Sequence, residues 1–68
     1  MKITVNGNEK VFNTELTVSQ LLKEENVKMP EMVSVELNGD ILKREDFDTT
    51  RLKDDDRIEF LYYMGGGQ

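Results

Sequence analysis

The last four residues of the sequence, Gly65-Gly66-Gly67-Gln68, form the segment whose residue types could take part in chemistry. The chain contains neither cysteine nor histidine, so it lacks a thiol nucleophile, thiolate metal ligands and the imidazole base that enzymes use most often. Residues 54–56 are three adjacent aspartates, but their carboxylates cannot all face one ion, and no fuller calcium-loop pattern follows them. We therefore predict a turn at these aspartates, no metal site and no catalytic residue.

Length and charge favour a carrier or binding module over an enzyme. The 68 residues allow one domain, and so small a core rarely leaves room for a deep pocket. Nine Lys and Arg against fourteen Asp and Glu give a net charge of −5. We therefore expect no binding to nucleic acid or to anionic membranes, and a basic protein partner instead. The sequence shows no apolar run of transmembrane length and no secretory leader, which predicts a cytoplasmic protein.

Consecutive glycines after an apolar strand are typical either of a frayed terminus or of a reactive end. Glycine has no Cβ, so such an end can pass through a narrow channel and approach another backbone closely. A terminal carboxylate becomes an electrophile once ATP has adenylated it, and a sulfur nucleophile can then displace AMP to leave a thioester or thiocarboxylate. The partner would supply Mg²⁺, the ATP site and the nucleophile, so the chain itself needs no bound cofactor.

Short patterns predict the elements that carry this end, in the order β-β-α-β-β-β. Thr17 and Gln20 fit a capping box, which begins a helix of about 8–10 residues that stops at Asn26. Phe47 is predicted to plug inward from a short 3₁₀ segment. Asn-Gly pairs at 6–7 and 38–39 predict two hairpin turns. The predicted strands are residues 2–6, 9–12, 33–37, 41–42 and 57–64.

The strand at 57–64 is apolar on both faces, which favours a central place in the sheet. The expected fold is α+β, a ubiquitin-like β-grasp in which one helix covers a mixed sheet of four or five strands. Residues 1–64 would form this domain, and residues 65–68 a flexible tail. Beside the tail, Leu61, Tyr63 and Gly65 are candidates for contact with a partner, because aromatic and apolar side chains dominate interfaces. We expect Leu61 or Tyr63 to be partly exposed and the other ring of the Tyr62-Tyr63 pair to be mostly in the core.

Over most of its length the chain resembles the ThiS/MoaD family of sulfur-carrier proteins. It is most similar to the ThiS members, the carriers of thiamin thiazole biosynthesis. The Leu37-Asn38-Gly39 turn, the Arg44-Glu45 pair and the aspartate-rich turn are together fairly specific, whereas a terminal Gly-Gly alone would be weak. The segments that carry the resemblance are residues 1–7, 17–22, 33–42, 43–45, 52–59 and 65–67.

The resemblance implies a β-grasp fold and a defined series of partners. In this family a ubiquitin-activating-type adenylyltransferase charges the last glycine with ATP and Mg²⁺, and the adenylate becomes a thiocarboxylate. That group then donates its sulfur, in the ThiS branch to thiazole synthase. By this resemblance Gly66 and Gly67 are the functional pair, and Gly67 carries the sulfur.

The sequence departs from the family pattern at two positions. Asp55 stands where a glycine is expected between two aspartates, which alters local strain only. Gln68 follows Gly67, so a peptidase would have to remove it before charging, as in carriers that serve homocysteine or cysteine synthesis. That branch stays open, as do a ubiquitin-like modifier conjugated through Gly67 and a non-covalent β-grasp adaptor with an inert tail.

Overall fold

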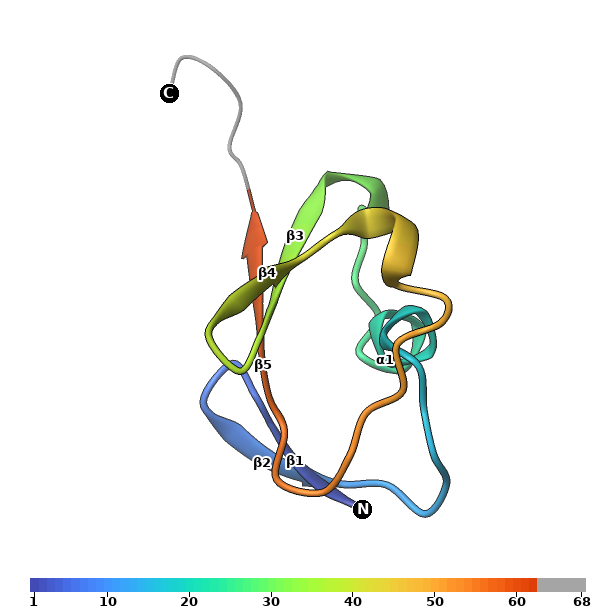
Figure 1. Cartoon of the computed structure of the whole chain (residues 1–68), viewed down its shortest axis with the longest axis vertical. Coiled ribbons are helices and arrows are strands. Elements are labelled where there is room, and N and C mark those ends of the chain that lie inside the picture. The colour runs from blue at the N-terminus through green and yellow to red at the C-terminus, as the bar shows by residue number, and fades with distance from the viewer. Residues whose placement is uncertain (63–68) are drawn as a thin grey trace.

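The computed structural model describes residues 1–62, which form a five-stranded sheet with one α-helix packed on one of its faces (Figure 1). The strands are β1 (Lys2–Val5), β2 (Asn8–Val11), β3 (Val33–Leu37), β4 (Asp40–Leu42) and β5 (Arg57–Tyr62). The helices are α1 (Val18–Glu24) and two short 3₁₀ helices, η1 (Pro30–Met32) and η2 (Arg44–Asp46). None of the helices in residues 1–62 is long and apolar enough to cross a membrane.

The strands lie in the order β2-β1-β5-β3-β4, which puts the last strand at the centre of the sheet. β5 is parallel to β1 and antiparallel to β3, and each outer strand pairs antiparallel with its hairpin partner. The mixed sheet, its five strands and the central place of β5 confirm the predicted β-grasp arrangement. The sequence-based boundary between domain and tail, at residues 64 and 65, lies outside the described residues.

Two hairpin turns set the register of the outer strands. Asn6 and Gly7 have φ angles of 51° and 85°, and Asn38 and Gly39 have φ angles of 53° and 91°. Positive φ at both central residues is the geometry of the two-residue turn that matches the twist of paired strands, and Asn-Gly adopts it with little strain. Both turns are where the sequence predicts them.

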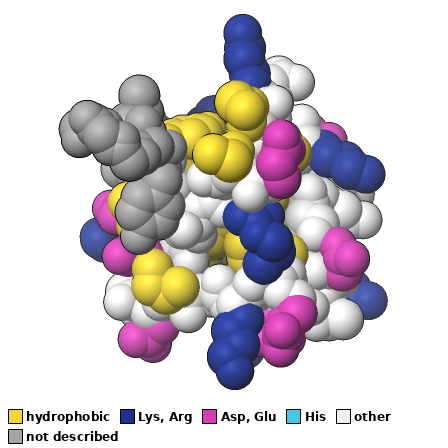
Figure 2. All heavy atoms as spheres, turned by 90° about the horizontal axis from the view of Figure 1, so that it is seen from above, with side chains coloured by type: hydrophobic (Ala, Val, Ile, Leu, Met, Phe, Trp, Pro, Cys, Tyr) yellow, Lys and Arg dark blue, Asp and Glu magenta, His cyan; other side chains and the backbone are white. Residues whose placement is uncertain are grey.

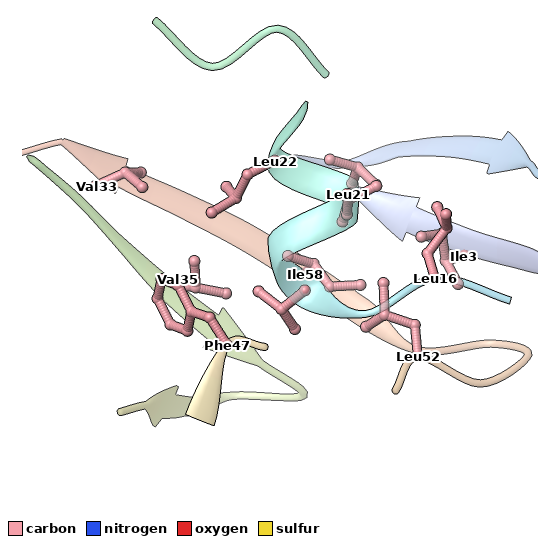
Figure 3. Close-up of a cluster of buried hydrophobic side chains, with 11 residues drawn as sticks. Ile3, Leu16, Leu21, Leu22, Val33, Val35, Phe47, Leu52 and Ile58 are labelled. Atoms are coloured by element: carbon pink, nitrogen blue, oxygen red, sulfur yellow. The ribbon is translucent and has the colours of Figure 1, made fainter. Parts of the chain in front are cut away.

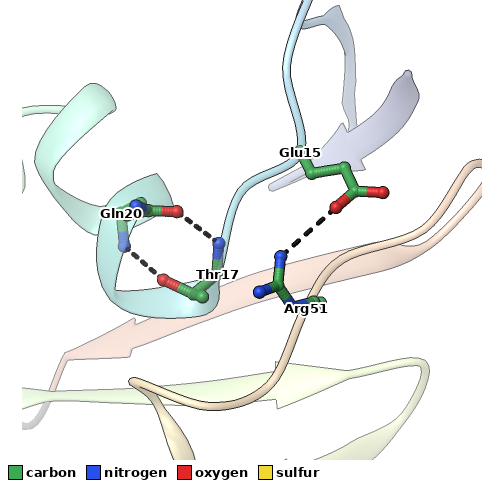
Figure 4. A network of polar contacts seen from close by, with 4 residues as sticks. All are labelled: Glu15, Thr17, Gln20 and Arg51. Carbon is green, nitrogen blue, oxygen red and sulfur yellow. Dashed lines mark hydrogen bonds and ion pairs between the residues drawn. The ribbon is translucent and has the colours of Figure 1, made fainter.

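The start of α1 is a complete capping box (Figure 4). The Thr17 hydroxyl accepts a hydrogen bond from the Gln20 backbone N–H at 3.2 Å, and the Gln20 side chain accepts one from the Thr17 N–H at 2.8 Å. These bonds satisfy backbone donors that would otherwise lack partners at the helix start. At the other end, Asn26 has a φ of 56° just after the C-cap Glu25, so it is the predicted left-handed residue.

The core lies between α1 and the sheet (Figure 3). The helix contributes Val18, Leu21 and Leu22, which fall on one face at helical spacing. Phe47 follows η2 and is 5% exposed, which confirms that this segment plugs the core. The buried residues are Ile3, Val5, Leu16, Val18, Leu21, Leu22, Val33, Val35, Phe47, Leu52 and Ile58.

Candidate functional site

The glycines proposed to do the chemistry follow the end of β5. Gly65, Gly66, Gly67, Gln68 and Tyr63 all lie outside the described residues 1–62, so their roles stay predictions. The described structure does contain the strand that carries them. β5 ends at Tyr62, at the end of the molecule opposite the N-terminus (Figure 1).

β5 is held along both edges, because it lies between β1 and β3. On the β1 side, the Thr4 N–H donates to the Asp56 carbonyl at 2.9 Å and the Asn6 N–H donates to the Ile58 carbonyl at 2.9 Å. On the β3 side, five consecutive residue pairs are in register, from Leu37 opposite Ile58 to Val33 opposite Tyr62. A chain that leaves the sheet from this strand is therefore anchored at the centre of the domain.

The Asn6 side chain extends the ladder of β1 along β5. β1 ends at Val5, and Asn6 turns away with a positive φ. Its Oδ1 nevertheless accepts a hydrogen bond from the Phe60 N–H at 2.8 Å. The amide thereby takes the place of the backbone carbonyl that a longer β1 would have offered. The sequence predicts Asn6 as the last residue of the strand at 2–6 and the first of the hairpin turn. Nothing local in the sequence indicates this contact across 54 positions.

Of the last two described residues of β5, one side chain has the predicted exposure and the other does not. Leu61 is 40% exposed, as predicted for a side chain on the face away from α1, although its role in partner binding is untested. Tyr62 lies on the same face as Ile58, where the sequence analysis placed a mostly buried ring, yet it is 51% exposed. That expectation is wrong: on this face of β5 only Ile58 and Phe60 pack on the core, although Val33, opposite Tyr62, is buried.

Two methionines lie at the same end of the sheet. Met29 and Met32 are 52% and 45% exposed. Met32 directly precedes Val33, the register partner of Tyr62, so it lies close to the end of β5. Figure 2 views the molecule from this end and shows hydrophobic side chains exposed among charged ones. Exposed Met and Tyr at one end are typical of an adaptable contact surface.

Arg44 holds the segments around this end together. Its guanidinium donates hydrogen bonds to the carbonyls of Pro30, at 2.8 Å, and Val33, and lies 5.2 Å from the centre of the Phe47 ring. Since Val35 pairs with Leu42, a longer β4 would place residue 44 opposite Val33. The chain turns into η2 there instead, and the Arg44 side chain satisfies the carbonyl that β4 leaves unpaired.

A groove of about 460 Å³ lies beside Arg44, between α1, η1 and η2. Its floor is apolar and its rim carries two cations and two anions, a mixture that favours no single ligand charge. The residues that line it are Ser19, Leu22, Lys23, Val27, Pro30, Glu31, Arg44, Phe47 and Asp48. The resemblance marked Arg44 as a motif residue, but its contacts could not be read from the sequence.

The three aspartates form the predicted turn before β5. The Asp54 carboxylate accepts a hydrogen bond from the Lys2 N–H at 2.8 Å, and the Asp56 carboxylate accepts from the Lys53 N–H at 2.8 Å and from the Asn38 side chain at 3.0 Å. Asp55 has a φ of 71°, so it occupies a position that suits the glycine of the family pattern. In the described part of the chain, no three carboxylates gather as a metal site would require.

Comparison with known proteins decides the family. The ThiS family model matches residues 2–67, nearly the whole chain. The chain belongs to the ThiS family. The family predicted from the sequence is thus confirmed, and the match also includes Gly65, Gly66 and Gly67.

Solved ThiS structures have the same fold. The crystal structure of the thiamine biosynthesis protein ThiS from Geobacter metallireducens is 49% identical, covers 98% of this chain and 100% of its own, and superimposes with a TM-score of 0.89. A solution structure of a thiamine biosynthesis protein from the same organism is 48% identical, covers 100% of this chain and 90% of its own, and has a TM-score of 0.80. These similarities confirm the β-grasp fold.

A longer relative matches as well. The thiazole synthase of Paramagnetospirillum magneticum is 34% identical over 67 residues, which make up 98% of this chain but 20% of that protein. The chain therefore spans about a fifth of the length of this relative.

Proposed function

We propose that the chain is a sulfur carrier rather than an enzyme, and that Gly67 bears the sulfur as a thiocarboxylate. The observation that carries this proposal is the extent of the family match, which runs to Gly67 and leaves Gln68 outside it. The architecture supports the same role. The glycines follow a strand that is bonded on both edges, so the domain can present them to a partner without losing its own pairing.

The proposed chemistry has two balanced steps. A carboxylate oxygen of Gly67 attacks the α-phosphorus of ATP, pyrophosphate leaves, and an acyl-adenylate forms. Hydrosulfide then attacks the acyl carbon, the carbon–oxygen bond to AMP breaks, AMP leaves, and the thiocarboxylic acid loses its proton to solvent. A ubiquitin-activating-type adenylyltransferase would bind the ATP and Mg²⁺, so the chain needs neither an imidazole nor a thiol, and it has neither.

A free carboxylate on Gly67 requires that the peptide bond to Gln68 be hydrolysed first. A trimming peptidase would supply this step. Gln68 is also the observation that favours a second candidate, a ThiS-like carrier whose sulfur enters homocysteine or cysteine. The two candidates share trimming and charging and differ only in the acceptor.

For the acceptor we favour thiazole synthase, and hence a role in making the thiazole of thiamin. The support is the relative from Paramagnetospirillum magneticum, in which a stretch similar to this chain is part of a protein named thiazole synthase. A carrier and its acceptor that occur together in one chain would have a high effective concentration for each other.

Intact mass spectrometry tests the charging step. Residues 1–67, incubated with the adenylyltransferase of the same organism, ATP, Mg²⁺ and a sulfide source, should gain the mass of sulfur replacing oxygen. The full 68-residue chain is the matched control and should remain unchanged until a peptidase removes Gln68. If residues 1–67 form neither the adenylate nor the thiocarboxylate, the proposal is wrong.

Two further measurements separate the candidates. The charged carrier should transfer sulfur to thiazole synthase and not to a homocysteine-forming enzyme, and the reverse result would favour the second candidate. A Gly67→Ala variant of residues 1–67 should keep the fold and lose most charging, because the added Cβ obstructs the narrow approach that the glycines allow. Normal charging of this variant would remove the steric argument.

A further inference from the structure

The two Asn-Gly turns each place an asparagine side chain against β5. The Asn6 Oδ1 accepts a hydrogen bond from the Phe60 N–H at 2.8 Å, and the Asn38 Oδ1 accepts one from the Arg57 N–H at 2.8 Å. Since β1 and β3 lie on opposite edges of β5, the two turns hold the strand from both sides. An asparagine followed by glycine is also the pair in which the side-chain amide is lost most readily, because glycine has no Cβ beside the attacking nitrogen.

Loss of the amide needs no reagent other than water. The glycine backbone nitrogen gives its proton to a base in the solvent and attacks Cγ of the asparagine. The bond from Cγ to Nδ2 breaks, and that nitrogen takes up a proton and leaves as ammonia. Water then opens the cyclic succinimide at one of its two carbonyls. One opening gives aspartate, and the other gives isoaspartate, whose backbone runs through the former side chain and contains an extra methylene.

Backbone geometry and exposure do not distinguish the two turns. Their asparagines have φ angles of 51° and 53°, their glycines have φ angles of 85° and 91°, and all four residues are exposed. A Cβ added at either glycine would meet nothing within 4 Å, but the positive φ would strain any other residue there. The fold therefore requires glycine in both turns, and with it the reactive pair.

The hydrogen bonds of the two side-chain amides do differ. The Nδ2 of Asn38 donates to the Asp56 carboxylate at 3.0 Å, whereas the Nδ2 of Asn6 has no hydrogen-bond partner within residues 1–62. Before Cγ can meet the glycine nitrogen at bonding distance, the side chain must give up the bonds that hold it elsewhere. Asn6 gives up one bond between neutral groups. Asn38 gives up such a bond and a second one to a charged group, which is the stronger kind.

We propose that Asn6 is a site of spontaneous modification, at which this chain forms isoaspartate, and that the Asp56 carboxylate protects Asn38 from the same reaction. The extra methylene lengthens the turn after β1 and moves the acceptor away from the Phe60 N–H. One edge of β5 thereby loses a hydrogen bond while the other edge keeps its own. This inference is independent of the proposed function, because it involves neither the glycine tail nor an adenylating partner.

Peptide mapping by mass spectrometry tests the site. The full chain is kept in warm neutral buffer, and each Asn-Gly peptide is followed for the mass gained when OH replaces NH₂. We expect Asn6 to react at least about tenfold faster than Asn38, since the additional charge-assisted bond of Asn38 must be broken first. In concentrated urea the two should react at similar rates, because only the fold distinguishes them. Equal rates in the folded chain, faster loss at Asn38, or an Asn6 that reacts only in urea would overturn the proposal.

An Asp56→Asn variant tests the protection of Asn38. The Asp56 carboxylate uses one oxygen for Asn38 and the other for the Lys53 N–H, and an asparagine side chain has only one oxygen for both. We expect the loss of the Asn38 amide to accelerate several-fold, towards the rate of Asn6. Asp54→Asn is the matched control, because it removes the same charge from the same turn without touching Asn38. If both variants remain folded by circular dichroism and Asn38 reacts equally slowly in both, Asp56 is not the protecting group.

Hydrogen exchange tests the structural consequence. The isoaspartate form is separated by chromatography, and its Phe60 amide should exchange faster than in the unmodified chain. An Asn6→Asp variant is the control for charge, since it adds the same negative charge but keeps the normal backbone and a carboxylate acceptor. Its Phe60 amide should stay protected. If the isoaspartate form protects the Phe60 amide as well as this variant does, the modification does not release β5 and that part of the proposal is wrong.

Discussion

Substitution of Asn6 tests how the end of β5 is held. Asn6 makes two separable contributions, because its Oδ1 accepts a hydrogen bond from the Phe60 N–H at 2.8 Å and its backbone has a φ of 51°. Glycine at this position keeps the backbone geometry and loses the acceptor. Alanine loses both the acceptor and the polar side chain that offsets the cost of a left-handed backbone, whereas aspartate keeps an acceptor and tolerates the positive φ.

The three variants should therefore fall in a definite order. We expect Asn6→Gly to lower the free energy of unfolding by about 1 kcal/mol, the net value of one such hydrogen bond. Asn6→Ala should lower it by about 2–3 kcal/mol, because a left-handed backbone costs about 1–2 kcal/mol and alanine has no polar side chain to offset that cost, as asparagine has. Asn6→Asp should stay close to the wild type. Since a domain of this size has a net stability of only about 3–5 kcal/mol, the alanine variant should lose about half of it.

Urea unfolding followed by circular dichroism measures this order, and amide hydrogen exchange locates its cause. In Asn6→Gly the Phe60 amide should exchange faster relative to the Asn38 amide, which donates to the Arg57 carbonyl at 2.7 Å and is the internal reference. If Phe60 keeps its relative protection in both the glycine and the alanine variants, the side-chain bond does not hold β5 and the reasoning is wrong.

Three further substitutions test the packing, the helix cap and the surface charge. Phe47→Ala should lower the free energy of unfolding by about 3–5 kcal/mol and leave much of the chain unfolded, because Phe47 is 5% exposed; a folded variant of near-normal melting temperature would contradict its role as the core plug. Thr17→Ala should cost about 1 kcal/mol in urea unfolding, whereas Thr17→Ser keeps the hydroxyl and should cost little; equal losses would mean that the cap bond is not the cause. Glu15→Gln should change stability by less than about 0.5 kcal/mol, since the Glu15 and Arg51 side chains are 75% and 71% exposed; a larger loss would mean that this ion pair (Figure 4) contributes more than exposed pairs do.

Local signals predicted most of the fold correctly. The Asn38-Gly39 turn and the Thr17 cap depend on residues within four positions of each other, so their chemistry is complete in a short stretch of sequence. The central place of β5 followed from a strand that is apolar on both faces. The family resemblance then added the hypothesis of a reactive glycine end, which no pattern of burial could have suggested.

The features that the sequence did not predict depend on where distant elements stop. Tyr62 is half exposed although Val33, opposite it on β3, is buried, and a strand pattern does not reveal how far along a strand the side chains are covered. The facing of Glu36 and Glu59 depends on the register of β3 against β5, which pairs residues more than twenty positions apart. Alternation along each strand gives the face of a side chain but not its neighbour across the sheet.

β5 combines two roles because its two faces and its two edges are used separately. Its inner face places Ile58 in the core, and its edges are occupied by β1, β3 and the Asn6 side chain. These contacts hold the strand without using its outer face, where Glu59 and Leu61 are exposed. A force applied to the proposed reactive end would therefore act on a strand hydrogen-bonded on both sides. An edge strand would offer half of those bonds, which is a physical reason for a carrier to extend its reactive end from the middle of the sheet.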